Sequence, residues 1–358
     1  MSSRPGINHH AFRTNFTELV GVRYPIVQTG MGWVAGPRLV AATAEAGGLG
    51  ILASATMSFT QFAEAVSEVK ARTNAPFGVN LRADQDDVTG RIDVLIREGV
   101  RVASFAMAPR PDLITRLQDG GVLVMPSVGA LRHAEKVVDW GVDAVLVQGG
   151  EGGGHTGEVA TSILLPQVVD TVDVPVVAAG GYFDGRGLVA ALAYGASAIA
   201  MGTRFLLTAD SPVPSEVKAY YLARNVTDTV RTTRLDGVPH RVLRTELVDE
   251  LETSSRLRGW ARAVRNAARF RKMAGTTWPA LLREGLAMRR TRELSWGQVL
   301  MAANTPMLLE AAMVRGRADL GLMSSGQVVG VLDDLPTVDE LMERIMAEAA
   351  LTLDQLTS

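Results

Sequence analysis

The chain has 358 residues, of which 47% are hydrophobic and 21% charged, and its net charge is −2. This composition is typical of a soluble globular protein, and the small net charge argues against non-specific nucleic-acid binding. Because cysteine is absent, disulfides, thiolate nucleophiles, iron–sulfur clusters and cysteine-ligated zinc are excluded. The N-terminal stretch Met1–Arg13 lacks a secretory signal, and the longest weakly polar run, Leu188–Met201, is too short to span a bilayer. The sequence therefore predicts a cytoplasmic protein without a membrane span.

Short apolar or β-branched runs recur along the first part of the chain, and stretches with helical spacing of apolar residues separate them. The eight runs are Pro25–Gln28, Leu49–Ala53, Phe77–Asn80, Val102–Phe105, Val122–Pro126, Ala144–Val147, Val176–Ala179 and Ala198–Met201. The helical stretches include Phe59–Arg72, Asp87–Gly99 and Ala130–Trp140. Such alternation predicts an α/β fold with a parallel sheet, and the eight repeats favour a closed (β/α)₈ TIM barrel.

The alternation stops after Phe205. Val230–Thr245 is expected to form two strands around Asp236–Gly237, a dipeptide that favours a type I′ hairpin turn. Helices are predicted over Glu252–Arg292, and an amphipathic helix is predicted over Leu335–Leu353. The predicted domains are a barrel over 1–211, a lid or small subdomain over 212–300, and a C-terminal segment over 301–358 that returns to the barrel.

Two glycine-rich loops follow the seventh and eighth predicted strands. In barrels of this type these loops frequently build a phosphate site. Here they contain Gly180 and Gly181 and then Gly202 and Thr203, whose backbone N–H groups and hydroxyl can approach an anion. Asp184 is expected to cap the helix that begins near Gly185. Glycines that only make tight turns are the alternative, but the two loops together favour a phosphate site.

Small and carboxamide side chains are expected at the strand ends. They are Gln28, Thr29, Gly30, Met31, Ala53, Ser54, Asn80, Ser104, Ser127 and Gln148. Phosphosugar enzymes with this fold need a metal cluster, a Schiff-base lysine or a carboxylate base at the barrel mouth, and none stands out, so no metal site is predicted. Carboxamides suit the heteroatom edge of a flavin, and Met31 could lie against its ring. As a set, these residues favour FMN.

The segment Gln148–Gly157 follows the sixth strand and holds six glycines in ten residues. We call it the His loop. Its one imidazole, on His155, is of the type that commonly moves protons near neutral pH, so His155 is predicted to be the catalytic acid/base. A structural histidine is the alternative, and a dinucleotide fingerprint is disfavoured by the eight βα repeats. His133 and His240 are expected to be structural or surface residues.

A basic stripe lies between Arg256 and Arg292, where eleven Arg or Lys residues accompany one acidic residue, Glu284. The predicted substrate-binding residues lie on one face of a predicted helix and are Arg258, Arg262, Arg265 and Arg269. They form either a solvated helix face or a landing surface for the phosphates of CoA or NAD(P)H. Attachment to a membrane surface is a third interpretation.

Five motifs carry a family resemblance: Pro25-Ile-Val-Gln28-x-x-Met31, Gly78-Val-Asn80, Glu151-x-Gly-Gly-His155-x-Gly157, Ala179-Gly180-Gly181 and Met201-Gly202-Thr203. Together they resemble the nitronate monooxygenase (2-nitropropane dioxygenase) superfamily, which also holds flavin-dependent enoyl-thioester reductases. The resemblance implies FMN and a catalytic base at His155. The cofactor contacts expected from it and from the strand ends are Gln28, Met31, Asn80, Gln148, Gly153, Gly180, Gly181, Gly202 and Thr203. Many nitronate enzymes have proline in place of Gly30 and alanine in place of Gly152, which moves the expected substrate away from nitronates.

Four longer stretches are similar to the actinobacterial branch associated with degradation of steroid rings C and D (IpdC-type flavin oxidoreductases). They are Gln28–Ala35, Gln148–Gly157, His240–Glu246 and Leu300–Met307. This resemblance implies CoA thioesters of bicyclic indane acids as substrates, which would give the basic stripe a purpose.

Three flavin-dependent activities stay open from the sequence. The first is dehydrogenation of a CoA thioester, by C–H deprotonation at His155 and hydride transfer to the flavin. The second is oxidation of alkyl nitronates with O₂, and the third is reduction of an enoyl thioester with NAD(P)H as co-substrate. A flavin-free phosphosugar enzyme and a catalytically silent FMN- or CoA-binding protein are alternatives of other classes. A homo-oligomer is a candidate assembly.

Overall fold

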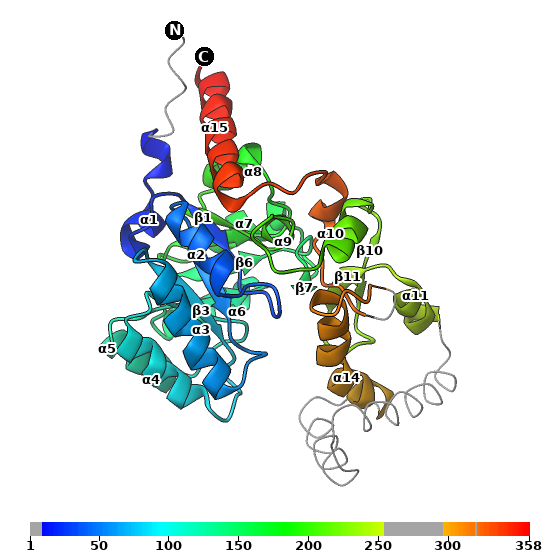
Figure 1. Ribbon diagram of the computed structural model, residues 1–358. Helices are drawn as coiled ribbons and strands as arrows, with labels where there is room; N and C mark the ends of the chain where they lie inside the picture. The colour runs from blue at the N-terminus through cyan, green and yellow to red at the C-terminus, as the bar shows by residue number, and fades with distance from the viewer. Residues whose placement is uncertain (1–8, 254–295, 319–320) are drawn as a thin grey trace. The chain divides into compact units, whose positions relative to one another are not determined.

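Eight parallel strands form a closed barrel in the computed structural model, which describes residues 9–253, 296–318 and 321–358 (Figure 1). The barrel strands are β1 (Ile26–Gln28), β2 (Leu49–Ala53), β3 (Phe77–Leu81), β4 (Val102–Phe105), β5 (Leu123–Val128), β6 (Val145–Gln148), β8 (Val176–Ala179) and β9 (Ala198–Met201). Each strand pairs with the next in this order, and β9 pairs with β1 to close the ring. The predicted TIM barrel is confirmed, and each of the eight predicted runs overlaps one strand, with ends that differ by up to two residues.

The helices alternate with the strands, as the spacing of apolar residues predicted. Those before and within the barrel are η1 (His10–Phe12), α1 (Asn15–Val20), α2 (Pro37–Glu45), α3 (Phe59–Arg72), α4 (Val88–Glu98), α5 (Pro111–Asp119), α6 (Leu131–Asp139), α7 (Thr161–Val169), α8 (Gly185–Ala193) and α9 (Thr203–Leu206). Those that follow are α10 (Ser215–Leu222), α11 (Glu246–Thr253), α14 (Trp296–Met313), η2 (Gln327–Val331) and α15 (Val338–Thr357).

Apolar side chains fill the barrel interior. Val27, Ile51 and Val177 belong to one buried cluster that also includes Phe16 and Val20 of α1. Burying a side chain such as Phe16 contributes about 1.5–3 kcal/mol, so α1 is held to the barrel largely by this face. The strand sequences are nearly continuous apolar runs, because a parallel sheet inside a ring of helices is buried on both faces.

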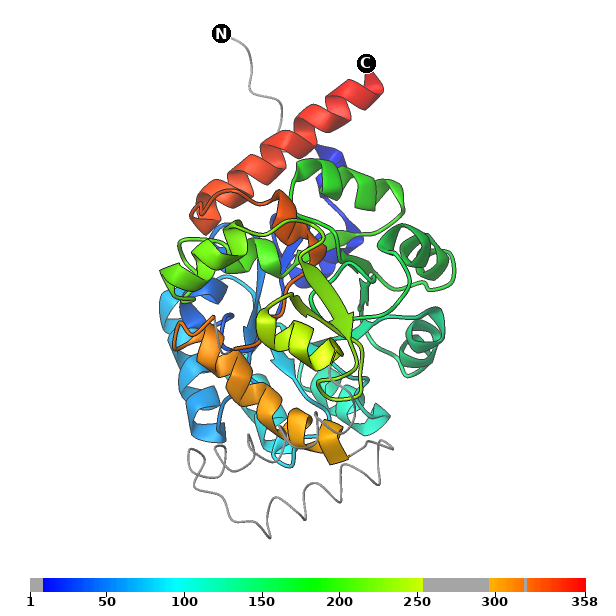
Figure 2. The same cartoon turned by 90° about the vertical axis from the view of Figure 1, so that its right-hand side faces the viewer.

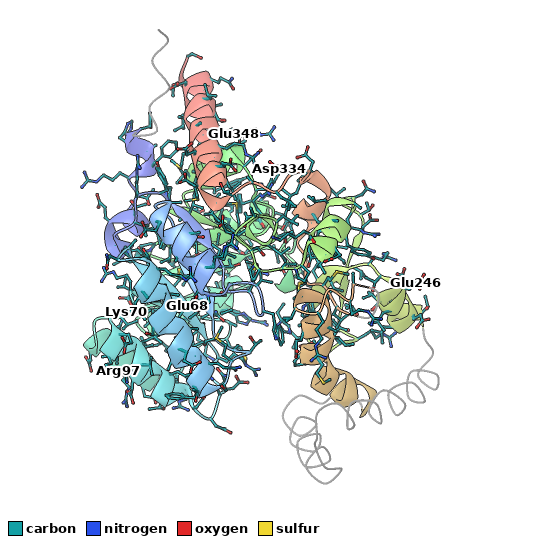
Figure 3. The ribbon with its side chains drawn as sticks, in the orientation of Figure 1. Glu68, Lys70, Arg97, Glu246, Asp334 and Glu348 are labelled. Atoms are coloured by element: carbon teal, nitrogen blue, oxygen red, sulfur yellow. The ribbon has the colours of Figure 1, made fainter. Side chains whose placement is uncertain are left out.

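The C-terminal helix α15 lies alongside α8 (Figures 1 and 2). A Cβ atom on Gly185 would lie 2.3 Å from the backbone nitrogen of Ala349, so only glycine permits this close approach. The backbone N–H of Gly185 donates to the carboxylate of Glu348, which Figure 3 labels on α15, over 3.0 Å. Thr337 and Glu340 form a capping box that begins α15. The predicted amphipathic terminal helix is therefore present, and it completes the barrel unit.

The chain divides into two compact units. The barrel unit comprises residues 1–152, 156–213 and 331–358, and the second unit comprises residues 153–155 and 214–330. The second unit holds an antiparallel sheet in the order β10 (Thr229–Thr232), β11 (His240–Leu243), β7 (Gly154–His155). Its core includes Leu235, Val242, Val248 and Leu322. The predicted domain boundaries and the lid role of residues 212–300 stay predictions.

The two strands predicted around Asp236–Gly237 are present as β10 and β11, but the predicted type I′ turn is wrong. That turn needs a positive φ at both central residues, and only Gly237 has one, at 82°. Residues 233–239 form the connection, with Gly237 N–H donating to the Thr233 carbonyl over 3.1 Å. The longer loop leaves the Asp236 side chain available for a different contact.

Most of the helical prediction over Glu252–Arg292, and the whole basic stripe, lie outside the described residues. Of the helices that are described, none combines the length and apolar character needed to cross a membrane.

Candidate active site

Three carboxamide side chains lie at the carboxyl edge of the barrel, as predicted. Gln28 ends β1 and pairs in register with Met201, and Gln148 ends β6 beside Ala179. Asn80 lies near the end of β3, and its Nδ2 is 3.4 Å from the Ser104 hydroxyl on β4. Because the strands are parallel, all three residues lie at the end of the barrel where the βα loops begin.

Gln28 has a buried acceptor that the fold itself does not use. Its Nε2 donates to the carbonyl of Ile51 over 3.3 Å and to that of Thr29. Because two carbonyls accept from the amide nitrogen, the position of Oε1 is fixed by the network. That oxygen is buried and has no hydrogen-bond partner among the described residues. A buried acceptor of this kind calls for a donor from a ligand or water.

The two predicted phosphate loops follow β8 and β9. Gly180 and Gly181 have φ values of 97° and 88°, a left-handed conformation that glycine adopts without strain. After β9, Gly202 and Thr203 begin α9, and a Cβ atom on Gly202 would lie 3.5 Å from the sulfur of Met31. The structure therefore brings Met31 to the loop after β9.

The predicted helix cap at Asp184 is confirmed. Its carboxylate accepts a hydrogen bond from the Gly187 N–H over 2.9 Å. Asp184 is therefore the N-cap of α8, which begins shortly after the Gly180–Gly181 loop. The cap fixes the direction in which the loop leaves the strand.

Sequence reasoning missed two residues that tie these loops together. The Glu151 carboxylate, in the His loop, accepts from the backbone N–H of Thr161 over 3.0 Å and lies 2.8 Å from its hydroxyl. The same hydroxyl lies 3.0 Å from the carbonyl oxygen of Gly180. Glu151 is thus an anchor at the start of α7, and Thr161 links the His loop to the loop after β8.

Arg204 follows the predicted phosphate residue Thr203 and is buried. Its guanidinium donates to the Asp334 carboxylate over 2.8 Å and to the carbonyls of Asp334 and Leu207. Burial lowers the pKa of Arg204, and the hydrogen bond to Asp334 opposes this shift. Figure 3 labels Asp334, which lies ahead of α15. Arg204 therefore holds the loop after β9 to the C-terminal segment of the barrel unit.

The predicted catalytic histidine lies in the second unit, on strand β7. His155 and Gly154 pair with His240 and Arg241 of β11. The Nε2 atom of His155 lies 2.6 Å from Oδ2 of Asp236. The His155 side chain is 56% exposed, whereas that of Asp236 is 13% exposed. Gly153, another predicted site residue, approaches Ser325 and Gly326 so closely that a Cβ atom would lie 2.6 Å from Gly326 nitrogen.

The environment of Asp236 keeps it ionised. Burial of the side chain acts to raise the pKa of Asp236. The hydrogen bond with His155 and the charge interaction with the same ring outweigh this effect, so the pKa of Asp236 lies below its usual range. The Val238 N–H also donates to this carboxylate over 3.1 Å. Ionised Asp236 therefore acts as a hydrogen-bond acceptor for the N–H of the His155 ring.

A second histidine packs against this pair. The ring centroids of His155 and His240 are 4.6 Å apart, and His240 is only 4% exposed. Burial, together with the charge on His155, lowers the pKa of His240 to about 4. Its Nε2 lies 2.9 Å from the Ser324 hydroxyl, and Ser324 is held in turn by Tyr221, whose hydroxyl donates to its carbonyl over 2.8 Å. His240 is thus neutral near pH 7.

This arrangement selects one tautomer of the neutral His155 ring. Because ionised Asp236 can only accept, the proton of neutral His155 lies on Nε2, and Nδ1 carries the lone pair. A histidine oriented in this way by a carboxylate can take up a proton at Nδ1 and share the resulting charge with Asp236. The group is suited to acid/base chemistry.

The structure places the remaining histidines and the arginines as follows. His133 lies exposed on α6, as expected. His240 was expected to be a structural or surface residue, and it is buried against the predicted base. Asp236, Ser324 and Tyr221 were not predicted as site residues. The four predicted substrate-binding residues Arg258, Arg262, Arg265 and Arg269 lie outside the described residues.

The family model described as nitronate monooxygenase matches residues 13–91 and 86–348. A Rhodococcus jostii protein named (3aS,4S,5R,7aS)-5-hydroxy-7a-methyl-1-oxo-octahydro-1H-indene-4-carboxyl-CoA dehydrogenase is 60% identical over 96% of this chain and 98% of its own length. A Mycobacterium tuberculosis protein of the same name is 62% identical over 94% of this chain and 96% of its own. The structure of FabK from Thermotoga maritima superposes with a TM-score of 0.79 at 33% identity, covering 96% of this chain and 98% of that one.

Proposed function

Because this chain belongs to the nitronate monooxygenase family and is an oxidoreductase, we propose that it is an FMN-dependent dehydrogenase of a CoA thioester. The acyl group is a hydroxylated bicyclic indane acid derived from steroid rings C and D. The names of the two actinobacterial relatives support this substrate class, and both matches cover nearly the whole chain. The observation in the structure that carries the proposal is the His155–Asp236 pair.

The residues at the carboxyl edge of the barrel fit FMN. The buried Oε1 of Gln28 is suited to accept from a ring N–H, and the carboxamides of Asn80 and Gln148 offer further donors and acceptors. The left-handed glycines 180 and 181, with Gly202 and Thr203, offer backbone N–H groups and a hydroxyl to a phosphate. Met31 completes the set in the barrel unit that would hold the cofactor, and Gly153 stays a predicted contact. When bound there, FMN supplies a two-electron acceptor.

His155 acts as the base in the proposed reaction. Dehydrogenation removes two hydrogen atoms from the substrate, one as a proton and one together with the electron pair. Nδ1 of His155 takes the proton from an acidic C–H bond of the thioester, while Asp236 holds the ring and stabilises its positive charge. Neutral His240 adds no like charge beside the ring at neutral pH. FMN held at the barrel edge would supply the acceptor for the second hydrogen and its electron pair.

The basic stripe is the proposed site for the phosphates of CoA. Arg258, Arg262, Arg265 and Arg269 present four guanidinium groups at helical spacing in the sequence, and such groups bind phosphate in a bidentate manner. Charge reversal at Arg265 and Arg269 should raise KM for the acyl-CoA and leave KM for a small alkyl nitronate unchanged. Equal effects on both substrates would contradict this role.

The deciding experiment is anaerobic mixing of the purified protein with three compounds in separate runs. We expect the hydroxyindane carboxyl-CoA thioester to remove the visible absorbance of the bound flavin fastest. Faster loss with an alkyl nitronate would favour nitronate oxidation, and faster loss with NAD(P)H would favour an enoyl-thioester reductase. A protein that stays colourless after addition of FMN would contradict the proposed cofactor.

A further inference from the structure

Three side chains of the second unit that can ligate a metal converge on one place. One ring nitrogen of His155, one of His240 and one carboxylate oxygen of Asp236 lie within 4.8 Å of one another. His155 is paired with His240 across β7 and β11, and directly opposite residues of an antiparallel pair project from the same face. The loop between β10 and β11 adds Asp236. The prediction of no metal site concerned the barrel mouth, and this cluster lies elsewhere.

The distances within the cluster suit a metal ion. Tetrahedral zinc bonds to nitrogen and oxygen at about 2.0–2.2 Å, which places neighbouring ligand atoms roughly 3.3–3.6 Å apart. The three ligand atoms therefore need only small side-chain rotations to surround one ion. Two imidazoles and one ionised carboxylate form a donor set that Zn²⁺, Cu²⁺ and Ni²⁺ bind readily, whereas Mg²⁺ prefers oxygen ligands alone.

His240 has a buried nitrogen that the fold does not use. Its Nε2 lies 2.9 Å from the Ser324 hydroxyl, whereas its Nδ1 is buried and has no hydrogen-bond partner among the described residues. A ring that donates through Nε2 to Ser324 keeps a lone pair on Nδ1. Metal-bound histidines commonly donate their second N–H to a protein oxygen in this way. The contact with Ser324 therefore prepares His240 to be a ligand.

The cluster is open on one side. Within the described part of the chain it supplies three protein ligands, which leaves a fourth position of a tetrahedral ion to water. The His155 side chain is 56% exposed, so an ion can reach the cluster from solvent. Such an ion exchanges with the solution, unlike one held in a closed site with four protein ligands.

We propose that His155, Asp236 and His240 form a binding site for a divalent transition-metal ion such as Zn²⁺, and that the bound ion switches off the base. The binding stands on the geometry alone, whereas the inhibition rests on the proposed role of His155. An ion on Nδ1 of His155 occupies the lone pair that would take up the substrate proton. An ion on Nε2 moves the ring proton to Nδ1, with the same result.

Calorimetric titration of the full chain with ZnCl₂, after removal of metal by a chelator, measures the dissociation constant of Zn²⁺. We expect one tight site in the wild type and no binding of Mg²⁺ at the same concentrations. Ser324→Ala should raise the constant about tenfold, since a partner of a metal ligand is worth about 10- to 100-fold in affinity. His155→Asn and Asp236→Asn each remove a ligand and should raise it by more than about 100-fold.

Other histidines provide the controls. His133→Asn changes the exposed histidine of α6. His10→Asn tests the other pair of histidine rings, since the ring centroids of His9 and His10 are 4.3 Å apart. Neither control should change the dissociation constant. Thermal unfolding without metal shows whether each variant folds, and Zn²⁺ should raise the Tm of the wild type but not that of His155→Asn.

Kinetics separate the binding from its effect. Zn²⁺ should lower kcat for the acyl-CoA, excess chelator should restore it, and Mg²⁺ should leave it unchanged. A wild type that binds no Zn²⁺, or that binds it no more tightly than His155→Asn does, would overturn the site and leave the proposed function untouched. Zn²⁺ bound at the cluster with kcat unchanged would instead contradict the role of His155 as the base.

Discussion

The barrel edge and the second sheet carry different kinds of chemistry. The barrel edge presents carboxamides, a hydroxyl and glycine backbone, and these groups keep the same charge throughout the working pH range. The second sheet presents His155 and His240, with Asp236 in the loop between β10 and β11, and the surroundings lower the pKa of both Asp236 and His240. Under the proposed function, holding the cofactor and moving the proton therefore fall to separate parts of the chain. Variants in the two regions should then have separable effects.

The largest effect is expected from removal of the base. His155→Asn should lower kcat by about 10²–10⁴-fold, the usual range for a lost general base, and leave the amount of bound FMN unchanged. Steady-state kinetics and the flavin content of the purified protein measure the two quantities. His133→Asn, on the exposed face of α6, is the matched control and should leave both unchanged. Loss of FMN from His155→Asn would break the proposed separation.

His240 should make the second unit sensitive to acid. Its pKa is about 4 in the folded protein and about 6.5 when unfolded, so the fold favours the neutral ring. The contribution of neutral His240 to the free energy of unfolding is fully present above about pH 6.5. It is lost as the pH falls toward 4, by about 3 kcal/mol in total. Asp236, whose pKa is lowered, adds a loss in the same direction.

Denaturant unfolding between pH 7.5 and 4.5 measures this dependence. The free energy of unfolding of the wild type should fall more steeply than that of His240→Asn, while His133→Asn should follow the wild type. Parallel curves for the wild type and His240→Asn would show that His240 is not held neutral by the fold.

Asp236→Asn should lower kcat/KM by about 10- to 100-fold, because a hydrogen bond to a charged group is worth about 1.5–3 kcal/mol. As Asp236 acts through His155, the variant should also change the shape of the pH–rate profile, which a purely structural role would not do. FMN affinity should stay at the wild-type value. Asp249→Asn, which breaks the exposed Arg244–Asp249 ion pair of the same unit, is the control and should change neither quantity.

The smallest of these effects is expected on the barrel side. Thr203→Ala should raise the dissociation constant of FMN about tenfold, through loss of one hydrogen bond to phosphate. At saturating FMN its kcat should stay within about twofold of the wild type. Thr115→Ala, exposed on α5, is the control. A large fall in kcat at saturating FMN would place Thr203 in the proton-transfer chemistry and contradict the comparison.

The barrel could be predicted from the sequence because its signals are local. Strands buried on both faces leave apolar runs. The positions at or just after the ends of those runs, such as Gln28, Gln148 and Gly180, lie at one edge by topology alone. The contacts of the second unit could not be predicted in this way, because they join residues far apart in the sequence. Asp236 lies 81 residues from His155, and Ser324 lies 84 residues from His240.

The type I′ turn failed for a related reason. The dipeptide Asp236–Gly237 was interpreted as the tip of a two-residue hairpin, whereas residues 233–239 form a longer loop that turns Asp236 toward His155. Local turn preference was overridden by a contact between distant segments. Sequence reasoning named the histidine but missed the carboxylate beside it.

Strand β7 has a consequence for any attempt to exchange parts between relatives. The strand is only two residues long. The chain leaves the barrel unit after Gly152, forms β7 as the edge strand of the second sheet, and re-enters the barrel unit at Thr156. Residues 214–330 are therefore not a self-sufficient cassette, since a graft of that segment alone would lack the strand on which His155 stands. A chimera that joins one relative's barrel to another's second unit must keep both sides of the β7–β11 pairing from the same parent.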